Sequence, residues 1–338
     1  MYRRQFISGV AGCLLLRGAT GFAGMPAREP LRWHSGVPLP LAMQEIYPAV
    51  YRGEIYVGGG LGLADPGYGV MGSLAPMRQV FRFASARKEW EAIPQLPVAR
   101  HHLGLVADGE YLYGIGGFAA DKQDPWQFSD VVVRWRAGEE GWQEGPKLPV
   151  PQAESCYACS DGALHVIAGR TPEGDTGRHW SLSGAHWEEA APLPLGRNSA
   201  ASVVFDGHIY VMGGRLYDRA HQNQTQVDRY DPAADRWEPV RPLPVATAGT
   251  AAAVLNGEIY LFGGEAREAL DADSERWITY REVWCYSPRA DEWRRAGVMP
   301  TGRHGMGAVA KESDIYLLGG ALGAGIDRTQ SRVDILSA

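Results

Sequence analysis

The stretch Ala201-Ser-Val-Val-Phe-Asp-Gly-His-Ile-Tyr-Val-Met-Gly-Gly214 consists of two apolar runs joined by an Asp-Gly pair, and it ends in two glycines. An Asp-Gly pair between apolar runs indicates a tight β-hairpin, because both turn positions tolerate a positive φ. Similar phrases recur along the chain, and their closing pairs, one of them degenerate, begin at Gly59, Gly116, Ala168, Gly213, Gly263 and Gly319. The chain therefore contains six copies of one hairpin unit.

A tryptophan precedes each closing pair at a constant distance. The separation is 26 residues in all six copies, counted from Trp33, Trp90, Trp142, Trp187, Trp237 and Trp293. The stretch from each pair to the next tryptophan varies from 19 to 31 residues. A constant length is what a packed scaffold requires, whereas surface loops can vary in length, so one half of the repeat is scaffold and the other carries the loops.

The rest of the repeat predicts two more strands. A run such as Val227-Asp-Arg-Tyr230 follows the variable loop, and a turn such as Asp231-Pro232 leads to the strand of the next tryptophan. Six units of four antiparallel strands predict an all-β, six-bladed β-propeller. The first tryptophan strand has no partner strands before it and the last unit, ending near Leu336, has no tryptophan strand after it. We expect the N-terminal strand to join the C-terminal blade and close the ring.

These phrases resemble kelch repeats. The apolar strand, the paired glycines, the tyrosine, the spaced tryptophan and a Leu-Pro turn such as Leu243-Pro244 all match that pattern. The resemblance covers roughly residues 32–336, and we assign residues 32–338 to one propeller domain. It implies a fold rather than a function, since propellers have many functions.

Composition excludes several classes of protein. The 338 residues include 43 glycines and 22 prolines, which argue against a helical bundle. The 45% hydrophobic content and 11 tryptophans argue against disorder. A net charge of −6 makes nucleic-acid binding through a general basic surface unexpected.

Residues 1–23 read as an export signal. Arg3-Arg4 precede a short apolar run that ends at Leu16, and small residues follow. The paired arginines resemble a twin-arginine signal, with an ordinary Sec signal as the alternative. The run is too short to span a bilayer, and lipidation at Cys13 remains open. We expect a periplasmic or secreted protein without stable membrane insertion, with residues 24–31 as a linker.

Three cysteines lie beyond this segment, at Cys156, Cys159 and Cys285. An odd number excludes a complete disulfide framework. Cys156 and Cys159 have metal-like spacing, but residues three apart in a strand face opposite sides. We expect buried thiols, no metal and no cofactor.

The kelch resemblance implies that the loops at one end of the propeller channel form the ligand site. Two positions in each repeat should reach this end, and because the blades point inward, equivalent positions of the six repeats should converge there. The residues directly after the closing pairs are Leu61, Phe118, Arg170, Arg215, Glu265 and Ala321. Arg170, Arg215 and Glu265 come from consecutive repeats. Two guanidinium groups can bind a carboxylate, and a neighbouring carboxylate can act as general acid or base. The alternative is a set of salt bridges at the rim.

The second position follows each Leu-Pro turn. Its residues are Glu45, His101, His102, Glu154, Asn198, Ser199, Gly249 and His304. His101, His102 and His304 could transfer protons near neutral pH, or simply bond to the backbone. Arg100, Arg197 and Arg303 begin three of these phrases, and we expect them to tie loops together.

The phrase Thr247-Ala-Gly-Thr-Ala-Ala-Ala-Val254, followed by Gly263-Gly264-Glu265-Ala266, resembles the N-acetylneuraminate epimerase (sialic acid mutarotase) family of periplasmic kelch propellers. The resemblance implies that Glu265 is the proton acceptor, assisted by His101 or His304. Arg170, Arg215, Glu45 and Asn198 are the candidate substrate contacts. The family has an arginine shortly beyond the glutamate; here Arg267 comes sooner and is the candidate for that place.

Two other functions remain open. A non-enzymatic module could bind glycans or a protein through the long loops at 61–79 and 265–280. A galactose oxidase-like copper enzyme would need two tyrosines, two histidines and a cross-linked cysteine, but no matching motif identifies these ligands and the chain is too short for the added domains. The partner we expect is a small sugar or sugar acid, with a protein partner possible.

Overall fold

The computed structural model describes residues 31–64, 71–119, 124–217, 221–269, 275–325 and 328–337. All of them belong to one compact unit, Leu31–Ala338. The predicted export segment 1–23, Cys13 and nearly all of the predicted linker 24–31 lie outside the described residues. None of the described residues forms a helix long and apolar enough to cross a membrane.

Six sheets of four antiparallel strands each make up the body of this unit. The first sheet contains β3 (Ala49–Tyr51), β4 (Glu54–Gly58), β7 (Val80–Ala84) and β8 (Glu89–Ala92). The second contains β10 (Gly104–Ala107), β11 (Leu112–Ile115), β14 (Val132–Trp135) and β15 (Gln143–Glu144). The third contains β16 (Cys156–Ser160), β17 (Ala163–Thr171), β18 (Gly174–Leu182) and β19 (Trp187–Ala190). The fourth sheet contains β20 (Ala201–Phe205), β21 (His208–Met212), β24 (Val227–Asp231) and β25 (Arg236–Pro239). The fifth contains β26 (Ala251–Leu255), β27 (Glu258–Phe262), β30 (Glu282–Ser287) and β31 (Glu292–Val298). The sixth contains β32 (Gly307–Lys311), β33 (Asp314–Leu318), β34 (Val333–Ser337) and β1 (Arg32–Ser35).

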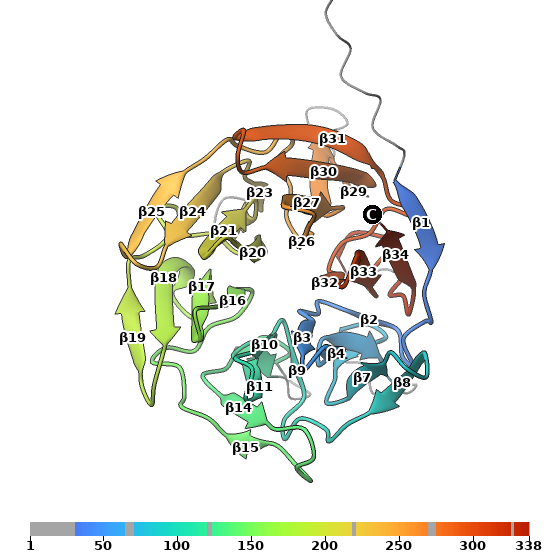
Figure 1. Cartoon of the computed structure of the whole chain (residues 1–338), viewed down its shortest axis with the longest axis vertical. Coiled ribbons are helices and arrows are strands. Elements are labelled where there is room, and N and C mark those ends of the chain that lie inside the picture. The colour runs from blue at the N-terminus through green and yellow to red at the C-terminus, as the bar shows by residue number, and fades with distance from the viewer. Residues whose placement is uncertain are drawn as a thin grey trace, which may run out of the picture. The chain divides into compact units, whose positions relative to one another are not determined.

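The sheets follow one another around a common centre, with β3, β10, β16, β20, β26 and β32 innermost (Figure 1). Each inner strand contacts that of the next sheet, and β32 contacts β3. In the sixth sheet β1 pairs with β34, with Trp33 opposite Leu336. The predicted all-β propeller architecture is confirmed.

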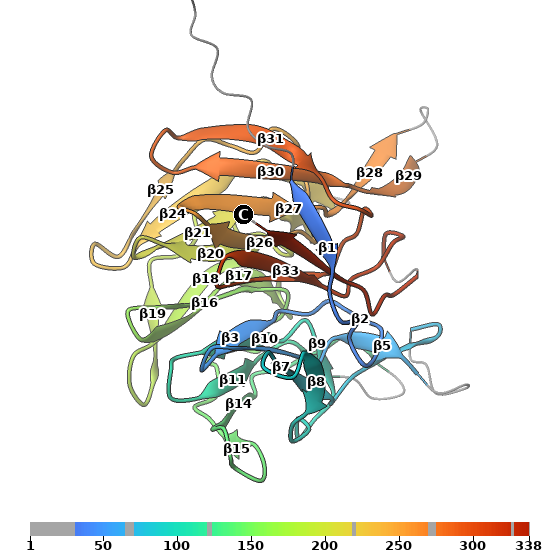
Figure 2. The same ribbon diagram turned by 45° about the vertical axis from the view of Figure 1, so that its right-hand side comes forward.

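Smaller sheets extend from one end of the large ones. Their strands are β2 (Met43–Gln44), β5 (Leu61–Leu63) and β6 (Leu74–Pro76); β9 (Arg100–His101), β12 (Phe118–Ala119) and β13 (Gln127–Phe128); β22 (Arg215–Leu216) and β23 (Gln222–Asn223); and β28 (Glu265–Ala269) and β29 (Glu275–Thr279). Figure 2 shows β28 and β29 projecting on the same side as β5. This end carries the residues that follow the closing glycine pairs.

The repeat tryptophans explain the constant spacing. Each indole Nε1 donates to a backbone carbonyl of the preceding repeat at 2.7–3.0 Å, and the acceptor of Trp33 is Val298, in the last repeat. The buried clusters also draw residues from two adjacent sheets; one of them joins Ile167 of β17 to Ile209 of β21. The core therefore lies between the sheets, and each tryptophan holds its own sheet against the one before it.

The closing glycines are required by the backbone. Gly213 and Gly214 have φ of 63° and 95°. A Cβ at either position would lie 2.7 Å from a carbonyl oxygen, that of Thr247 or Asn198. Because such a contact is closer than real side chains allow, the pair permits the chain to turn outward at this point.

Arg100, Arg197 and Arg303 are fully buried, as the prediction of a structural role requires. Arg197 donates to the Gly213 carbonyl and pairs with Asp228 at 2.8 Å. Arg303 pairs in the same way with Asp334 at 2.6 Å. These guanidinium groups thus hold strands of their own sheet together at the point where the outer loops begin.

Two imidazoles are buried where the third and fourth sheets meet. Nδ1 of His165 lies 2.9 Å from Nε2 of His179, whose ring packs edge-on against Tyr230. Burial lowers the pKa of His165 to about 4, and burial together with His165 lowers the pKa of His179 to about 4. Both rings are therefore neutral in the folded protein near pH 7.

We predict that stability falls as the pH drops from about 6.5 toward 4, because the unfolded histidines take up protons before the folded ones do. A shift of this size in one imidazole corresponds to on the order of 3 kcal/mol. Urea unfolding of the wild type and of the His165→Gln/His179→Gln variant at several pH values tests this. The variant should lose less stability across that interval, and equal slopes would contradict the prediction.

Candidate functional site

The two predicted positions of each repeat lie side by side. They pair as antiparallel bridges in all six repeats: Gln44 with Leu61, His101 with Phe118, Ala153 with Arg170, Asn198 with Arg215, Ala248 with Glu265, and His304 with Ala321. The smaller sheets and these bridges thus bring twelve residues to the end of the unit from which the loops extend. Polar side chains from this region, Glu45 of the first repeat included, meet there.

The next residue in each repeat forms an inner ring. Glu45, His102, Glu154, Ser199, Gly249 and Gly305 all have φ between 52° and 63°. The amide of Glu45 donates to the Gly305 carbonyl at 2.7 Å, Gly305 donates to Gly249 at 2.9 Å, and Gly249 donates to Ser199 at 2.9 Å. The amides of Ser199 and His102 continue the ring, donating to Glu154 at 3.1 Å and Glu45 at 3.3 Å.

The two glycines of this ring make room for larger neighbours. A Cβ at Gly305 would lie 2.4 Å from Oε1 of Glu45, and one at Gly249 would lie 3.5 Å from Nδ1 of His304. Both polar side chains therefore lie over ring positions that have no side chain.

Glu265 is the centre of a buried polar cluster. Its side chain is 3% exposed, and its Oε1 accepts a hydrogen bond of 2.6 Å from Nη1 of Arg215. Its Oε2 accepts a bond of 2.9 Å from the amide of Gly325 and lies 3.5 Å from Nδ1 of His304. The carboxylate thus faces a guanidinium on one side and an imidazole on the other.

His304 stands between two carboxylates. Its Nε2 lies 3.0 Å from the Gly323 carbonyl, which can only accept, so this nitrogen carries a hydrogen. Its Nδ1 lies 3.5 Å from Oε2 of Glu265 and 3.6 Å from Oε1 of Glu45. A proton on Nδ1 can therefore be passed to either carboxylate.

The hydrogen-bond network makes His102 an imidazolium. Nε2 of His101 must donate to the Pro125 carbonyl at 2.8 Å, so its Nδ1 accepts from Nδ1 of His102 at 2.6 Å. Nε2 of His102 faces Oε2 of Glu45 at 3.0 Å and Oε1 of Glu154 at 3.7 Å. Both nitrogens of His102 therefore carry hydrogens.

The electrostatics agree with this assignment. Burial disfavours the imidazolium, but the carboxylates of Glu45 and Glu154 raise the pKa of His102. Burial and the charge of His102 lower the pKa of His101 to about 3. Burial alone would raise the pKa of Glu45, but His102, His304 and Arg215 lower it to about 2.

We predict that ¹⁵N NMR of histidine-labelled protein shows both nitrogens of His102 protonated at pH 7.5. The Glu45→Gln variant should titrate His102 at a lower pH, because the nearest carboxylate is gone. A Glu258→Gln variant, in the fifth sheet, should leave His102 unchanged. A neutral His102 at pH 7.5 in the wild type would contradict the assigned network.

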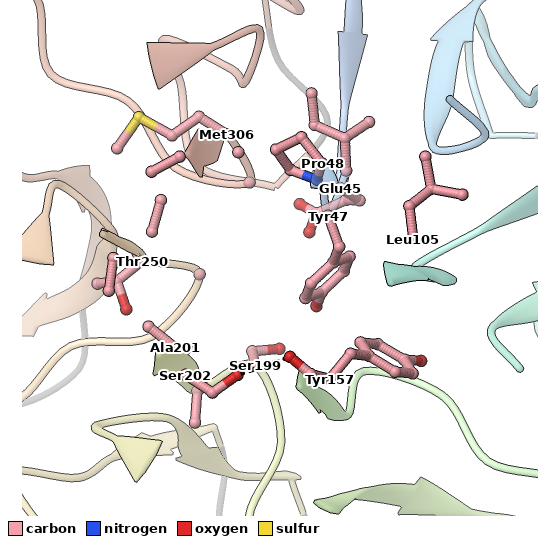
Figure 3. Close-up of a pocket in the computed structure, with 18 residues that line it drawn as sticks. Glu45, Tyr47, Pro48, Leu105, Tyr157, Ser199, Ala201, Ser202, Thr250 and Met306 are labelled. Atoms are coloured by element: carbon pink, nitrogen blue, oxygen red, sulfur yellow. Dashed lines mark hydrogen bonds between the residues drawn. The ribbon is translucent and has the colours of Figure 1, made fainter. Parts of the chain in front are cut away.

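A cavity of about 100 Å³ lies along the inner strands next to this cluster. Figure 3 shows Tyr47, Tyr157, Ser202, Thr250 and Met306 arranged around it, with Glu45 among them. Its volume is well below the roughly 300 Å³ of small ligand pockets. Glu265, Arg215 and His304 do not line it, so the cluster at the end of the channel, not the cavity, is the candidate site.

Known proteins share the repeat seen in this fold. Residues 196–244 and 246–300 match the kelch motif. Both matched segments lie within the propeller described above. Its architecture is similar to the solved structure of YjhT, with a TM-score of 0.73 at 14% identity over 90% of this chain and 97% of that chain. At this level of identity the likeness shows the fold alone.

Curated proteins match this chain over shorter segments. Beta-scruin of Limulus polyphemus is 25% identical over 154 residues, which are 46% of this chain and 16% of that protein. A kelch repeat-containing protein of Arabidopsis thaliana is 28% identical over 167 residues, 48% of this chain and 36% of that protein. Kelch repeat protein M-T8 of Myxoma virus is 30% identical over 95 residues, 28% and 18% of the two chains. The matched segments span little more than a third of these relatives at most.

Among the predicted site residues, Glu265, Arg215, His304 and Glu45 meet directly. Arg170 joins them through Glu154, at 3.3 Å. Arg215 also donates to Oγ of Ser199 at 3.3 Å. These residues form one continuous polar cluster across several repeats.

Three predicted residues lie beside this cluster. Asn198 donates to Oδ1 of Asp175 at 2.6 Å. His101 is fully buried behind His102, with its ring tilted against that of Phe118 at 5.1 Å. Arg267 is exposed, with its guanidinium over the ring of Trp277 at 4.8 Å.

From the sequence, His102 was expected only as a possible proton shuttle and Glu154 had no role assigned, and Asp175 was not found. Both His102 and Glu154 occupy the same repeat position as Glu45, which was the available signal. Asp175 lies in the variable half of the repeat. Because the length of this half differs between copies, Asp175 has no equivalent position in the other copies that would point to it.

The three cysteines in the described part of the chain, Cys156, Cys159 and Cys285, are free thiols. Cys156 packs in the core between the third and fourth sheets, whereas Cys159 packs on the other side of the third sheet, as residues three apart in a strand should. Within the described residues, no group of three or more His, Cys, Asp and Glu could hold a metal ion.

Proposed function

We propose that this kelch propeller interconverts the anomers of a free sugar acid, N-acetylneuraminate or a related sugar, at the Glu265 cluster. The observation that carries the proposal is the contact of the nearly buried Glu265 with both Arg215 and His304 at the end of the channel. Burying a charge away from water costs free energy, and such groups concentrate at functional sites. The proposed fold is a closed ring of six blades, supported by the β1–β34 pairing and the β32–β3 contact.

The cluster contains the groups that mutarotation needs. The Glu265 carboxylate takes the proton of the anomeric hydroxyl as the bond between the anomeric carbon and the ring oxygen breaks. The imidazolium form of His304, whose Nε2–H stays bonded to the Gly323 carbonyl, gives its Nδ1 proton to that ring oxygen and becomes neutral, and the open-chain keto form results. Rotation exposes the other face of the carbonyl. On reclosure Glu265 returns its proton to the carbonyl oxygen and His304 recovers its own, so protons balance over the cycle.

The arginines suit the charge of a sugar acid. Arg215 is bonded to Glu265, and Arg170 is bonded to Glu154 on the neighbouring side of the inner ring. A guanidinium can bind a carboxylate through two parallel hydrogen bonds. We assign these arginines to the substrate carboxylate, with Glu45 and Asn198 as further polar contacts, and we assign His101 a positioning role through His102.

Two other candidates have less support. A non-enzymatic glycan- or protein-binding module would have no evident need for a buried acid beside a buried imidazole. A galactose oxidase-like site would bring a cysteine to the metal, but Sγ of Cys285 lies 3.3 Å from Glu258 in the fifth sheet, where burial raises its pKa to about 12. Export through residues 1–23 remains part of the proposal, and the periplasmic fraction of a source cell should contain the protein.

NMR of freshly dissolved, anomerically pure N-acetylneuraminate tests the activity. The α-to-β signals should equilibrate faster with the protein than without it, in proportion to its concentration. No acceleration at protein and sugar concentrations that give measurable binding would overturn the proposal.

A further inference from the structure

Three large aromatic side chains are exposed on the loops around the cluster. Trp126, Tyr217 and Trp277 are 40%, 42% and 41% exposed. They come from the second, fourth and fifth repeats, each in the segment that follows a closing glycine pair. Exposed tryptophan and tyrosine gathered in one region are typical of binding surfaces rather than of ordinary protein surface.

Contacts link these side chains into one aromatic arc, which we define as Trp126, Phe118, Tyr217, His221 and Trp277. The ring of Trp126 lies 5.1 Å from that of Phe118. Tyr217 lies 4.7 Å from His221, and His221 lies 5.9 Å from Trp277. The arc is therefore much longer than a single sugar ring.

Arginines are interleaved with the arc. The guanidinium carbon of Arg170 lies 3.8 Å from the ring centre of Tyr217 and 5.7 Å from that of Phe118, so it joins the two halves. Arg267 covers Trp277 at 4.8 Å. Stacked guanidinium groups hold the rings in place and add positive charge along the arc.

The arc is continuous with the candidate site. The same Arg170 side chain that stacks on Tyr217 is bonded to Glu154, which faces His102 in the cluster. Burial, with Arg215 and Arg267, lowers the pKa of His221, so its ring is neutral near pH 7. A ligand held at Glu265 can therefore extend along the arc without leaving the surface.

We propose that the aromatic arc is a second binding site, for the further units of a short acidic oligosaccharide whose reducing end reaches Glu265. The C–H groups on one face of a pyranose ring carry partial positive charge and pack against the negative faces of aromatic rings. The interleaved Arg170 and Arg267 match the carboxylates that such a chain carries on successive units. This proposal rests on the proposed function.

Isothermal calorimetry with N-acetylneuraminate and with its α2,8-linked dimer, which has a free reducing end, tests the arc. The wild type should bind the dimer about 10-fold more tightly than the monomer, the gain expected when one more ring stacks. Trp277→Ala should remove most of that preference and leave monomer binding unchanged. Leu63→Ala, an exposed apolar residue outside the arc, is the matched control and should keep the preference.

The outcomes separate the two proposals. Equal affinity of the wild type for monomer and dimer would overturn the arc proposal, leave the proposed function standing, and make a protein the remaining occupant of the arc. A dimer preference that survives in Trp277→Ala and in Trp126→Ala would also overturn it. Binding of neither sugar would overturn the proposed function, and the arc proposal with it.

Discussion

The Glu265→Gln variant should accelerate N-acetylneuraminate mutarotation about 100- to 10,000-fold less than the wild type, the range that a general acid or base usually contributes. An amide cannot take the proton of the anomeric hydroxyl. Its oxygen can still accept from Nη1 of Arg215, and glutamine has the same shape as the glutamate that it replaces. The loss should therefore appear in the rate rather than in the fold, as measured by NMR of the anomers and by circular dichroism.

Glu258→Gln is the matched control for this variant. Glu258 is also a carboxylate paired with an arginine, Arg294, but it lies in the fifth sheet away from the cluster. It should keep the wild-type rate. A folded Glu265→Gln protein that retains that rate would remove Glu265 from the mechanism.

The fold could be predicted because one contact recurs in every repeat. The indole of each repeat tryptophan must reach a carbonyl of the preceding repeat, as Trp237 reaches Ala191 at 2.8 Å. Only a fixed chain length between that strand and the closing glycines keeps the sheets in register. The constant spacing of 26 residues in the sequence results from this requirement. The variable half has no such requirement, and so loop contacts such as Asn198 with Asp175 could not be predicted.

The candidate site could be predicted in part. Arg215 and Glu265 were found because each follows a closing glycine pair, and the strand register places them on adjacent repeats. The pairing of His102 with Glu45 and Glu154 was not predicted, because it depends on a left-handed backbone, with φ of 52° at His102 and 53° at Glu154. Glycine stands at the same position in two repeats, at Gly249 and Gly305, which is the sequence signal for such a conformation.

Side-chain direction explains the remaining differences. Alternation along a strand places Arg267 on the same face as Glu265, yet Glu265 is 2% exposed whereas Arg267 is exposed. The hairpin β28–β29 projects from the body of the unit, so its second inward position already lies outside the cluster (Figure 2). His101 differs from Arg267, because its ring lies in the core. The ring of the next residue, His102, points into the cluster instead.

The inner ring holds its polar groups at a conformational cost. A left-handed backbone at a residue other than glycine costs on the order of 1 kcal/mol or more, and Glu45, His102, Glu154 and Ser199 all adopt it. Strained residues of this kind persist where the surrounding structure fixes them, often at functional sites. Here the fixing elements are the bridges to the outer strands and, before His102 and Ser199, the buried Arg100 and Arg197.

The Arg197→Met variant should lose about 3–5 kcal/mol of stability, the usual cost of removing one partner from a buried ion pair. Arg197 is fully buried, and its loss leaves the Asp228 carboxylate and the carbonyls of Gly213 and Val211 without their guanidinium donors. Urea unfolding measures the change. A loss below about 1 kcal/mol would contradict the role assigned to this pair.

The double variant Arg197→Met/Asp228→Val separates the unpaired charge from the packing. Valine already stands at the equivalent position of the second sheet, where Val133 lies in the strand next to Arg100. Removing both charges should therefore restore part of the lost stability. The Gly213 carbonyl would still lack its donor, and Gly213 lies two residues before Arg215. If Arg197 also positions the cluster, the double variant should regain stability but keep a weakened affinity for the sugar acid.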